Sequence, residues 1–336
     1  MLKNRRTQLL SRFSQKISVT GIKTFFAKPL DFLKRQVDTW PKLGLWGFAL
    51  VAVLYYPLGA FLTHSIDADT AYEMPPTDNQ SAALGTSAYL IKREINDKIW
   101  TPNLPFFFPA YVLDNMPAFQ KGLVSSIADV VTAMSKRIPI KKDSYLYKAA
   151  ELLNYPPTIW MFSPQNKLLP APSSNSQYRR ARKFLLKYND ALARGETVFL
   201  KRPQDLAFIL QKIRYGLQKS SDALENHIRE NSGGLFDNKA DDVFYFQQGK
   251  LYGDYLLLKA LSADYKDIIV AQNLYQTWTR LLKTLEDASH LSPLIVRNGE
   301  LNSSVAPNHL AVMGYYANRA IINLQELVKN LEKMPQ

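Results

Sequence analysis

Apolar side chains recur at spacings of three and four residues through most of the chain after residue 80. Leu84, Ala88, Ile91, Ile95 and Ile99 follow this spacing in the first such segment. A helix turns once every 3.6 residues, so side chains spaced in this way lie on one face and are buried together. The pattern continues in segments 123–134, 178–193, 206–229, 243–261, 268–285 and 309–331. We therefore predict an all-α fold, with a multi-helix bundle over residues 81–333.

Residues that favour the beginnings and ends of helices fit these segments. Ser173 precedes one of them as a candidate N-cap, and Pro203 suits the first turn of another. Gly195 and the Gly233-Gly234 pair suit helix ends, where a left-handed backbone is common. We find no repeat of fixed period and no sustained heptad pattern, so the sequence favours neither a solenoid nor a long coiled coil.

Two proline-rich segments, 101–117 and 154–172, interrupt the helical pattern. Proline removes a backbone donor and restricts the residue before it, so both segments are expected to be loops. They also carry large aromatic side chains: Phe106, Phe107, Phe108, Tyr111, Trp160 and Phe162. We expect these side chains to pack the loops onto the helical body, because large apolar groups are usually buried. The alternative is an exposed docking surface.

Residues 43–62, LGLWGFALVAVLYYPLGAFL, contain no charged side chain. A helix of this length spans about 30 Å, the thickness of a bilayer core. We predict a transmembrane helix at 43–63 and a linker at 64–80 that contains Pro75-Pro76. A cleaved signal peptide fits less well, because 42 residues precede the apolar run.

Charge is distributed unevenly about this apolar run. The chain has a formal net charge of +13, and residues 1–42 hold ten basic side chains against two acidic ones. Four acidic residues and no Lys or Arg lie between the run and Lys92. By the positive-inside rule the N-terminus is cytoplasmic and the helical domain lies across the membrane. We predict that residues 1–42 are a basic cytoplasmic segment. Within it, residues 9–40 carry helix-spaced apolar groups and form either an amphipathic helix on the leaflet or a disordered leader.

The sequence contains little that indicates catalysis or cofactor binding. It has no cysteine, no close histidine pair of the zinc type, and no phosphate-binding or nucleophile-elbow motif. We therefore expect no cofactor and no metal site. Because the positive charge gathers beside the apolar run rather than on the helical body, we also expect no nucleic-acid partner.

Two groups of polar residues are candidates for binding a partner. The first lies in the first proline-rich segment, where the surrounding residues are mostly apolar: Asn103, Asp114 and Asn115. Asn115 has an alternative role as the N-cap of a helix beginning near Pro117. The second is a basic run that could meet an anionic group: Arg179, Arg180, Arg182 and Lys183. Its alternative role is a solvated helix face.

Several blocks of sequence resemble, in order, an uncharacterised bacterial envelope family, the domain-of-unknown-function family numbered 2333. They include WTPNLPFFFPAYVLDNMPAFQKG, ELLNYPPTIWMFS and DDVFYFQQGKLYGDYLLLKAL. The resemblance implies a bacterial protein of the inner membrane with a periplasmic domain, and it implies no activity. We therefore expect a non-enzymatic, membrane-anchored protein that binds an envelope protein or polymer. The alternative is an anchored enzyme whose carboxylates are brought together by folding.

Overall fold

The computed structural model describes residues 42–75, 79–138, 144–163, 166–199, 201–231, 237–299 and 307–333. The predicted basic segment 1–42 lies outside these residues except for Lys42, and so does the Gly233-Gly234 pair. A helix runs from Lys42 to Thr63, with a mean hydropathy of 1.8, and it is long and apolar enough to cross a membrane. The chain divides into two compact units at the Leu58–Gly59 bond, inside this helix.

Helices dominate the second unit, which confirms the all-α prediction. The helices are α3 (Ala82–Lys92), η1 (Arg93–Asp97), η2 (Pro109–Val112), α4 (Asn115–Lys136), α5 (Tyr145–Leu153), α6 (Ser174–Ala193), α7 (Pro203–Asn231), α8 (Ala240–Asp264), α9 (Lys266–Ala271), α10 (Tyr275–Ser289) and α11 (His309–Glu332). Two short antiparallel strands, β1 (Phe162–Ser163) and β2 (Asn166–Pro170), form a hairpin within the second proline-rich segment.

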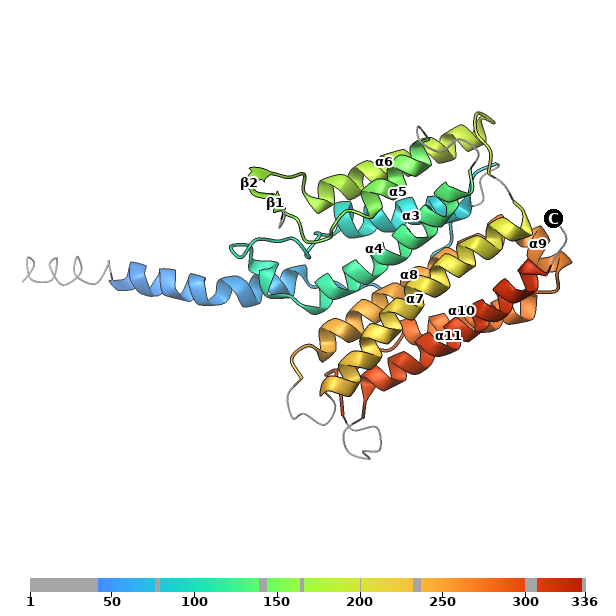
Figure 1. The fold of residues 1–336 in the computed structure, drawn as a ribbon. Coiled ribbons are helices and arrows are strands. Elements are labelled where there is room, and N and C mark those ends of the chain that lie inside the picture. Colours follow the sequence, from blue (N-terminus) through green and yellow to red (C-terminus); the bar gives the residue numbers. More distant parts are fainter. Residues whose placement is uncertain are drawn as a thin grey trace, which may run out of the picture. The chain divides into compact units, whose positions relative to one another are not determined.

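The long helices α4 and α8 form the centre of the bundle. Helices α3, α5 and α6 pack on one side of this pair, and α7, α10 and α11 pack on the other (Figure 1). Buried side chains, both apolar and polar, lie all around α8, as expected for a helix at the centre of a bundle. Two glycines allow α4 and α8 to approach closely. A Cβ on Gly122 would overlap the carbonyl of Phe246, and one on Gly249 would overlap the carbonyl of Phe119.

Most predicted helix boundaries agree with the structure, with one difference in the segment 268–285. Helix α7 begins at Pro203, and Gly195 follows α6 with a left-handed φ of 71°. The predicted helix 268–285 is wrong as a single element, because α9 ends at Ala271 and α10 begins at Tyr275. Asn273, with φ 52°, turns the chain between them, and asparagine tolerates this conformation better than most residues.

The segment 64–75, predicted as part of a linker, packs along the bundle instead. The hydroxyl of Tyr252 in α8 donates to the carbonyl of Asp69 at 2.8 Å. Farther along, Tyr72 stacks on Tyr89 of α3 with ring centroids 3.7 Å apart. This segment therefore forms a strap, residues 64–75, that is held to the bundle by specific contacts.

Candidate functional site

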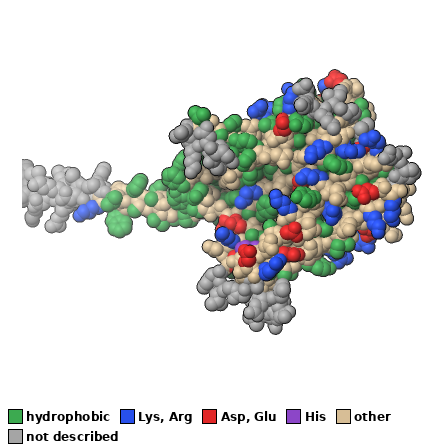
Figure 2. Space-filling view, viewed as in Figure 1, with side chains coloured by type: hydrophobic (Ala, Val, Ile, Leu, Met, Phe, Trp, Pro, Cys, Tyr) green, Lys and Arg blue, Asp and Glu red, His purple; other side chains and the backbone are tan. Residues whose placement is uncertain are grey.

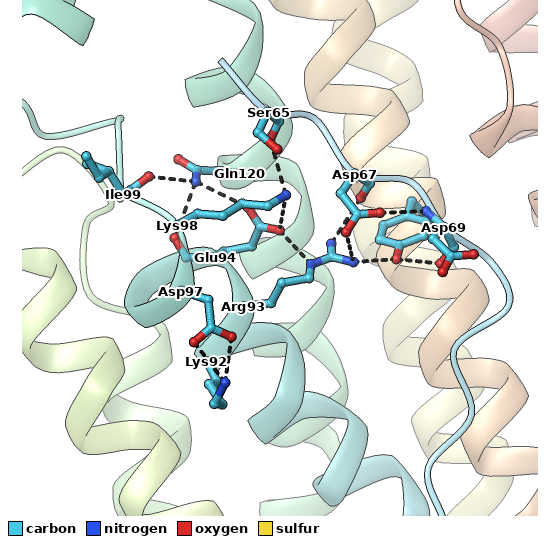
Figure 3. Close-up of polar contacts among 11 residues, drawn as sticks. Ser65, Asp67, Asp69, Lys92, Arg93, Glu94, Asp97, Lys98, Ile99 and Gln120 are labelled. Atoms are coloured by element: carbon cyan, nitrogen blue, oxygen red, sulfur yellow. Dashed lines mark hydrogen bonds and ion pairs between the residues drawn. The ribbon is translucent and has the colours of Figure 1, made fainter. Parts of the chain in front are cut away.

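Two clusters of buried charged side chains lie in the bundle, one around Arg93 and one around Lys250. The first surrounds Arg93, at the start of the π-helix η1 (Figure 3). Its Nε lies 2.8 Å from Glu94 Oε1, its Nη1 donates to the Tyr252 hydroxyl at 2.7 Å, and its Nη2 donates to the Asp67 carbonyl at 3.1 Å. Arg93 thus joins η1, α8 and the strap.

The carboxylate of Glu94 in this cluster is equally well satisfied. Lys98 Nζ lies 3.3 Å from Oε1, and Gln120 Nε2 donates to Oε2 at 3.2 Å. Gln120 also donates to the carbonyl of Ile99 (Figure 3). Its amide oxygen accepts from the hydroxyl of Thr101. A buried ion pair with every charge partnered holds elements in register. We assign this cluster a structural role, fastening the strap to η1, α4 and α8.

The second cluster is centred on Lys250 of α8. Only 1% of the Lys250 side chain is exposed, and its Nζ lies 3.0 Å from Asp129 Oδ2 and 3.8 Å from Asp254 Oδ2. Lys212 approaches the same Asp129 carboxylate from α7, at 3.1 Å from Oδ1. A Cβ on Gly216 would overlap that carboxylate, so the absence of a side chain there leaves room for it. The cluster joins α4, α7 and α8.

The charges of the second cluster influence one another strongly. Burial raises the pKa of Asp254 to about 6, although the attraction of Lys250 opposes this shift. Burial lowers the pKa of Lys250, but the carboxylates of Asp254 and Asp129 outweigh that effect and raise it. Lys250 is therefore a cation at neutral pH. Perturbed pKa values of this kind often accompany functional sites.

An open pocket of about 590 Å³ adjoins the second cluster, between α4, α7, α8 and the segment 153–157. Its wall includes four lysines but a single carboxylate, that of Asp129; the lysines are Lys121, Lys212, Lys219 and Lys250. Three tyrosines also line it: Tyr155, Tyr178 and Tyr215. Asp254 is fully buried behind this wall and does not line the pocket. The pocket is therefore basic and partly aromatic, a combination suited to an anionic ligand.

The structure places Asn103, the first predicted partner-binding residue, inside the protein. Its side chain is 5% exposed and donates from Nδ2 to the carbonyl of Ile159 at 2.8 Å. This hydrogen bond connects the two proline-rich segments. Asn103 therefore positions these loops, and its side chain is not available to a partner.

Asp114 and Asn115 lie at the start of α4, and Asp114 rather than Asn115 caps the helix. The prediction that Asn115 caps a helix beginning near Pro117 is wrong: α4 begins at Asn115, and Asp114 is the N-cap, with Oδ1 accepting from the Asn115 backbone at 2.8 Å. Aspartate stabilises this end because its charge opposes the positive end of the helix dipole. Asp114 remains exposed.

The basic run of α6 divides between structural contacts and surface. Arg179 donates from Nη2 to the carbonyl of Ile95 at 3.1 Å, and Arg182 donates from Nε to the carbonyl of Ala88 at 3.2 Å. Both arginines thus tie α6 to the α3–η1 helix. Arg180 and Lys183 are exposed, and so is Arg179 despite its hydrogen bond, whereas Arg182 is half-buried. The four residues do not converge on a pocket with Asn103, Asp114 and Asn115, which belong to other elements.

The aromatic side chains of the proline-rich segments differ most from expectation. We predicted that they pack onto the helical body, and this prediction is wrong for most of them. Exposed fractions reach 70% for Phe106, 54% for Tyr111 and 40% for Trp160. The loops are instead held from beneath, by Asn103 and by the indole of Trp100, which donates to the carbonyl of Pro157 at 3.0 Å.

Sequence reasoning missed the residues at the centre of both charge clusters. Lys250 and Asp254 stand four residues apart within the apolar sequence of α8, and Arg93 and Glu94 stand between the apolar residues of α3 and η1. Charged side chains within a long apolar segment are costly to bury unless they are paired. The presence of these charged residues among apolar ones was the signal in the sequence that they are buried and paired. The partners Asp129 and Tyr252 come from other helices, and no pattern along the chain identifies them.

Within the described residues, no group of three or more His, Cys, Asp and Glu side chains is arranged to hold a metal ion. A comparison with curated proteins and a comparison with solved structures each give no match. A comparison with protein families matches residues 103–233 and 236–331 to a family described as an uncharacterised protein conserved in bacteria. The match covers most of the chain and includes α4 to α11. The chain therefore belongs to this bacterial family, the domain-of-unknown-function family numbered 2333.

Proposed function

We propose that this protein is anchored in the bacterial inner membrane by the helix Lys42–Thr63, with residues 1–42 in the cytoplasm and the helical body in the periplasm. Two observations support this placement. The helix is uncharged between its flanks and long enough to cross a bilayer core. Ten basic side chains precede it, and acidic ones follow it.

The helical body, in this proposal, binds an anionic polymer of the cell envelope. The observation that carries this proposal is the pocket with four lysines and a single carboxylate. Lys212 and Lys250 are held by Asp129, so they provide fixed positive charge in the wall. Lys121 and Lys219 form no ion pair with any described residue, and they are the side chains we expect to contact the ligand.

Binding is favoured over catalysis because of where the carboxylates lie. A pair of carboxylates working as acid and base must face the same substrate. Asp129 lines the pocket but is paired with two lysines, and Asp254 is fully buried behind it. The two carboxylates are therefore not open to one ligand, although folding does bring them close to one cation, Lys250.

The test is binding of soluble, carboxylate-bearing peptidoglycan fragments to the purified full chain in detergent, measured by calorimetric titration. We expect saturable binding that weakens as salt is raised, because exposed charges are screened. The double variant Lys121→Gln, Lys219→Gln should lower the affinity about tenfold, which corresponds to the loss of about 1.4 kcal/mol. The cluster of Lys250 and Asp129 remains intact in this variant.

The matched control is the double variant Lys266→Gln, Lys329→Gln, which removes the same charge from two exposed positions on α9 and α11. We expect it to bind the fragments as the parent does. Equal losses in both double variants would indicate a general charge effect rather than a site. If the parent shows no binding, the assignment of an envelope polymer of this type is wrong.

A further inference from the structure

The exposed apolar side chains of the two proline-rich segments form one patch, which we call the aromatic patch. Its members are more than one-third exposed: Phe106, Phe107, Phe108, Tyr111, Val112, Trp160, Met161, Phe162 and Leu169. The two segments meet through Phe107 and Trp160, whose rings lie edge to face with centroids 5.6 Å apart. In Figure 2, hydrophobic side chains gather on the part of the body where Figure 1 draws β1, β2 and the loop before α4.

The composition of the patch is typical of a surface that becomes buried in a contact with another molecule or with lipid. Residues 104–113, LPFFFPAYVL, and 155–163, YPPTIWMFS, contain no charged side chain. A contiguous cluster of this kind is uncommon on a water-facing surface and marks contact with a protein or a membrane. Tryptophan and tyrosine in particular favour the boundary between lipid and water.

The patch is also held in place rather than being free to collapse inward. The loop turns through a hydrogen bond from the Phe108 amide to the Pro105 carbonyl at 2.9 Å, and η2 follows directly. Beneath it, Asn103 donates to the carbonyl of Ile159 in the second segment. The fold therefore fixes these aromatic rings at the surface.

The position of the patch in the second unit indicates what covers it. That unit begins at Gly59, so the last residues of the apolar helix belong to it. A Cβ on Gly59 would overlap the side chain of Pro109, the residue that follows Phe108 and opens η2. The first aromatic loop thus lies against Gly59, four residues before the apolar helix ends at Thr63. A transmembrane helix leaves the hydrocarbon core near such an end.

We infer that the aromatic patch inserts into the outer face of the same bilayer that the helix Lys42–Thr63 crosses. This inference rests on the anchoring proposed above. Insertion to the depth of the headgroup boundary would bury the rings and leave the loop backbone near water, as in other interfacial anchors. The body would then be held against the membrane at two places, the helix and the patch, which fixes its orientation relative to the lipid surface.

Single cysteines provide a direct test, because the chain contains none. Val112→Cys and Met161→Cys each place a nitroxide label in one loop of the patch. Leu50→Cys places one in the apolar helix, and Ile322→Cys places one at an exposed apolar position on α11. The full chain is reconstituted into vesicles of phosphatidylethanolamine and phosphatidylglycerol. Paramagnetic resonance then measures collisions of each label with oxygen, which partitions into lipid, and with a water-soluble nickel chelate.

We expect the ratio of oxygen collisions to nickel collisions to be highest at position 50 and lowest at position 322. At positions 112 and 161 we expect this ratio to be several-fold higher than at position 322. If labels at 112 and 161 behave like the label at 322 while position 50 is lipid-exposed, the anchor holds and the inference is wrong. Protection of 112 and 161 from both reagents would identify a protein partner or a second copy, which also overturns it. A water-exposed label at position 50 would refute the anchoring itself.

Discussion

At the residue scale, two neighbouring cations form ion pairs that matter differently for stability, because one pair is exposed to water and the other is buried. Lys92 and Arg93 are adjacent, and each pairs with a carboxylate at less than 3 Å. The Lys92 pair with Asp97 is about half exposed, so water and salt screen it. The Arg93 pair with Glu94 is almost fully buried, so the loss of either partner leaves a charge without water.

This contrast predicts different losses of stability from similar substitutions. Arg93→Met should lower the free energy of unfolding by about 3 kcal/mol or more, because Glu94 stays buried without its main partner. Lys92→Met should cost less than about 1 kcal/mol, since its ion pair is exposed. Urea unfolding of the full chain in detergent, followed by circular dichroism at 222 nm, measures both. Equal losses would contradict the structural role assigned to the Arg93 cluster.

At the element scale, the close packing of α4 against α8 explains much of the architecture. Both helices are long, and glycines at Gly122 and Gly249 let the backbone of each approach the other. The pair then presents separate faces to the remaining helices. Lys250 follows Gly249 directly, so the same contact that joins the helices also positions the cation beside Asp129 of α4.

We predict that Gly249→Ala destabilises the protein by roughly 1–3 kcal/mol, because the added Cβ meets the rigid carbonyl of Phe119 and forces the helices apart. Gly314→Ala on α11 is the matched control. Its Cβ would lie 3.1 Å from the end of the Leu224 side chain, which is able to shift. Alanine favours helix over glycine, so the control should be neutral or slightly stabilising. The same urea titration distinguishes the two, and a neutral Gly249→Ala would refute the close contact.

At the scale of the whole molecule, the distribution of charge about the apolar helix determines the expected topology. The basic side chains before residue 43 and the acidic ones between 64 and 78 lie on opposite sides of the helix in sequence. Moving Lys and Arg across a bilayer is unfavourable, so we expect the basic end to stay in the cytoplasm.

Alkaline phosphatase fused to the C-terminus should therefore be active in cells, because that enzyme folds only after export. The same enzyme fused directly after Lys42, before the apolar helix, should be inactive. Whole-cell phosphatase activity, normalised to the amount of fusion protein, gives the comparison. The reverse pattern of activity would overturn the orientation proposed here.

The local sequence pattern was sufficient to predict those features that depend on residues close together along the chain. Periodic apolar residues predicted most of the helices, and Pro203 and Gly195 predicted a helix start and a helix end, because backbone geometry acts over a few residues. The uncharged run at 43–62 predicted the one described helix able to span a membrane, because the length of such a helix is fixed by the bilayer. The short helix α5, over Tyr145–Leu153, was missed because nine residues give too few repeats of the pattern.

Tertiary structure alone decided which polar and aromatic side chains are available to a partner. Asn103 has the sequence context of an exposed loop residue, yet it is buried because a carbonyl from the second loop, at Ile159, reaches it. Phe106 is a large apolar residue of the kind found in cores, yet its side chain is 70% exposed in the first proline-rich loop. Lys250 and Asp129 are separated by 121 residues and meet only when α4 and α8 pack. Burial and pairing depend on contacts between distant segments, and spacing along the chain does not identify the partners in those contacts.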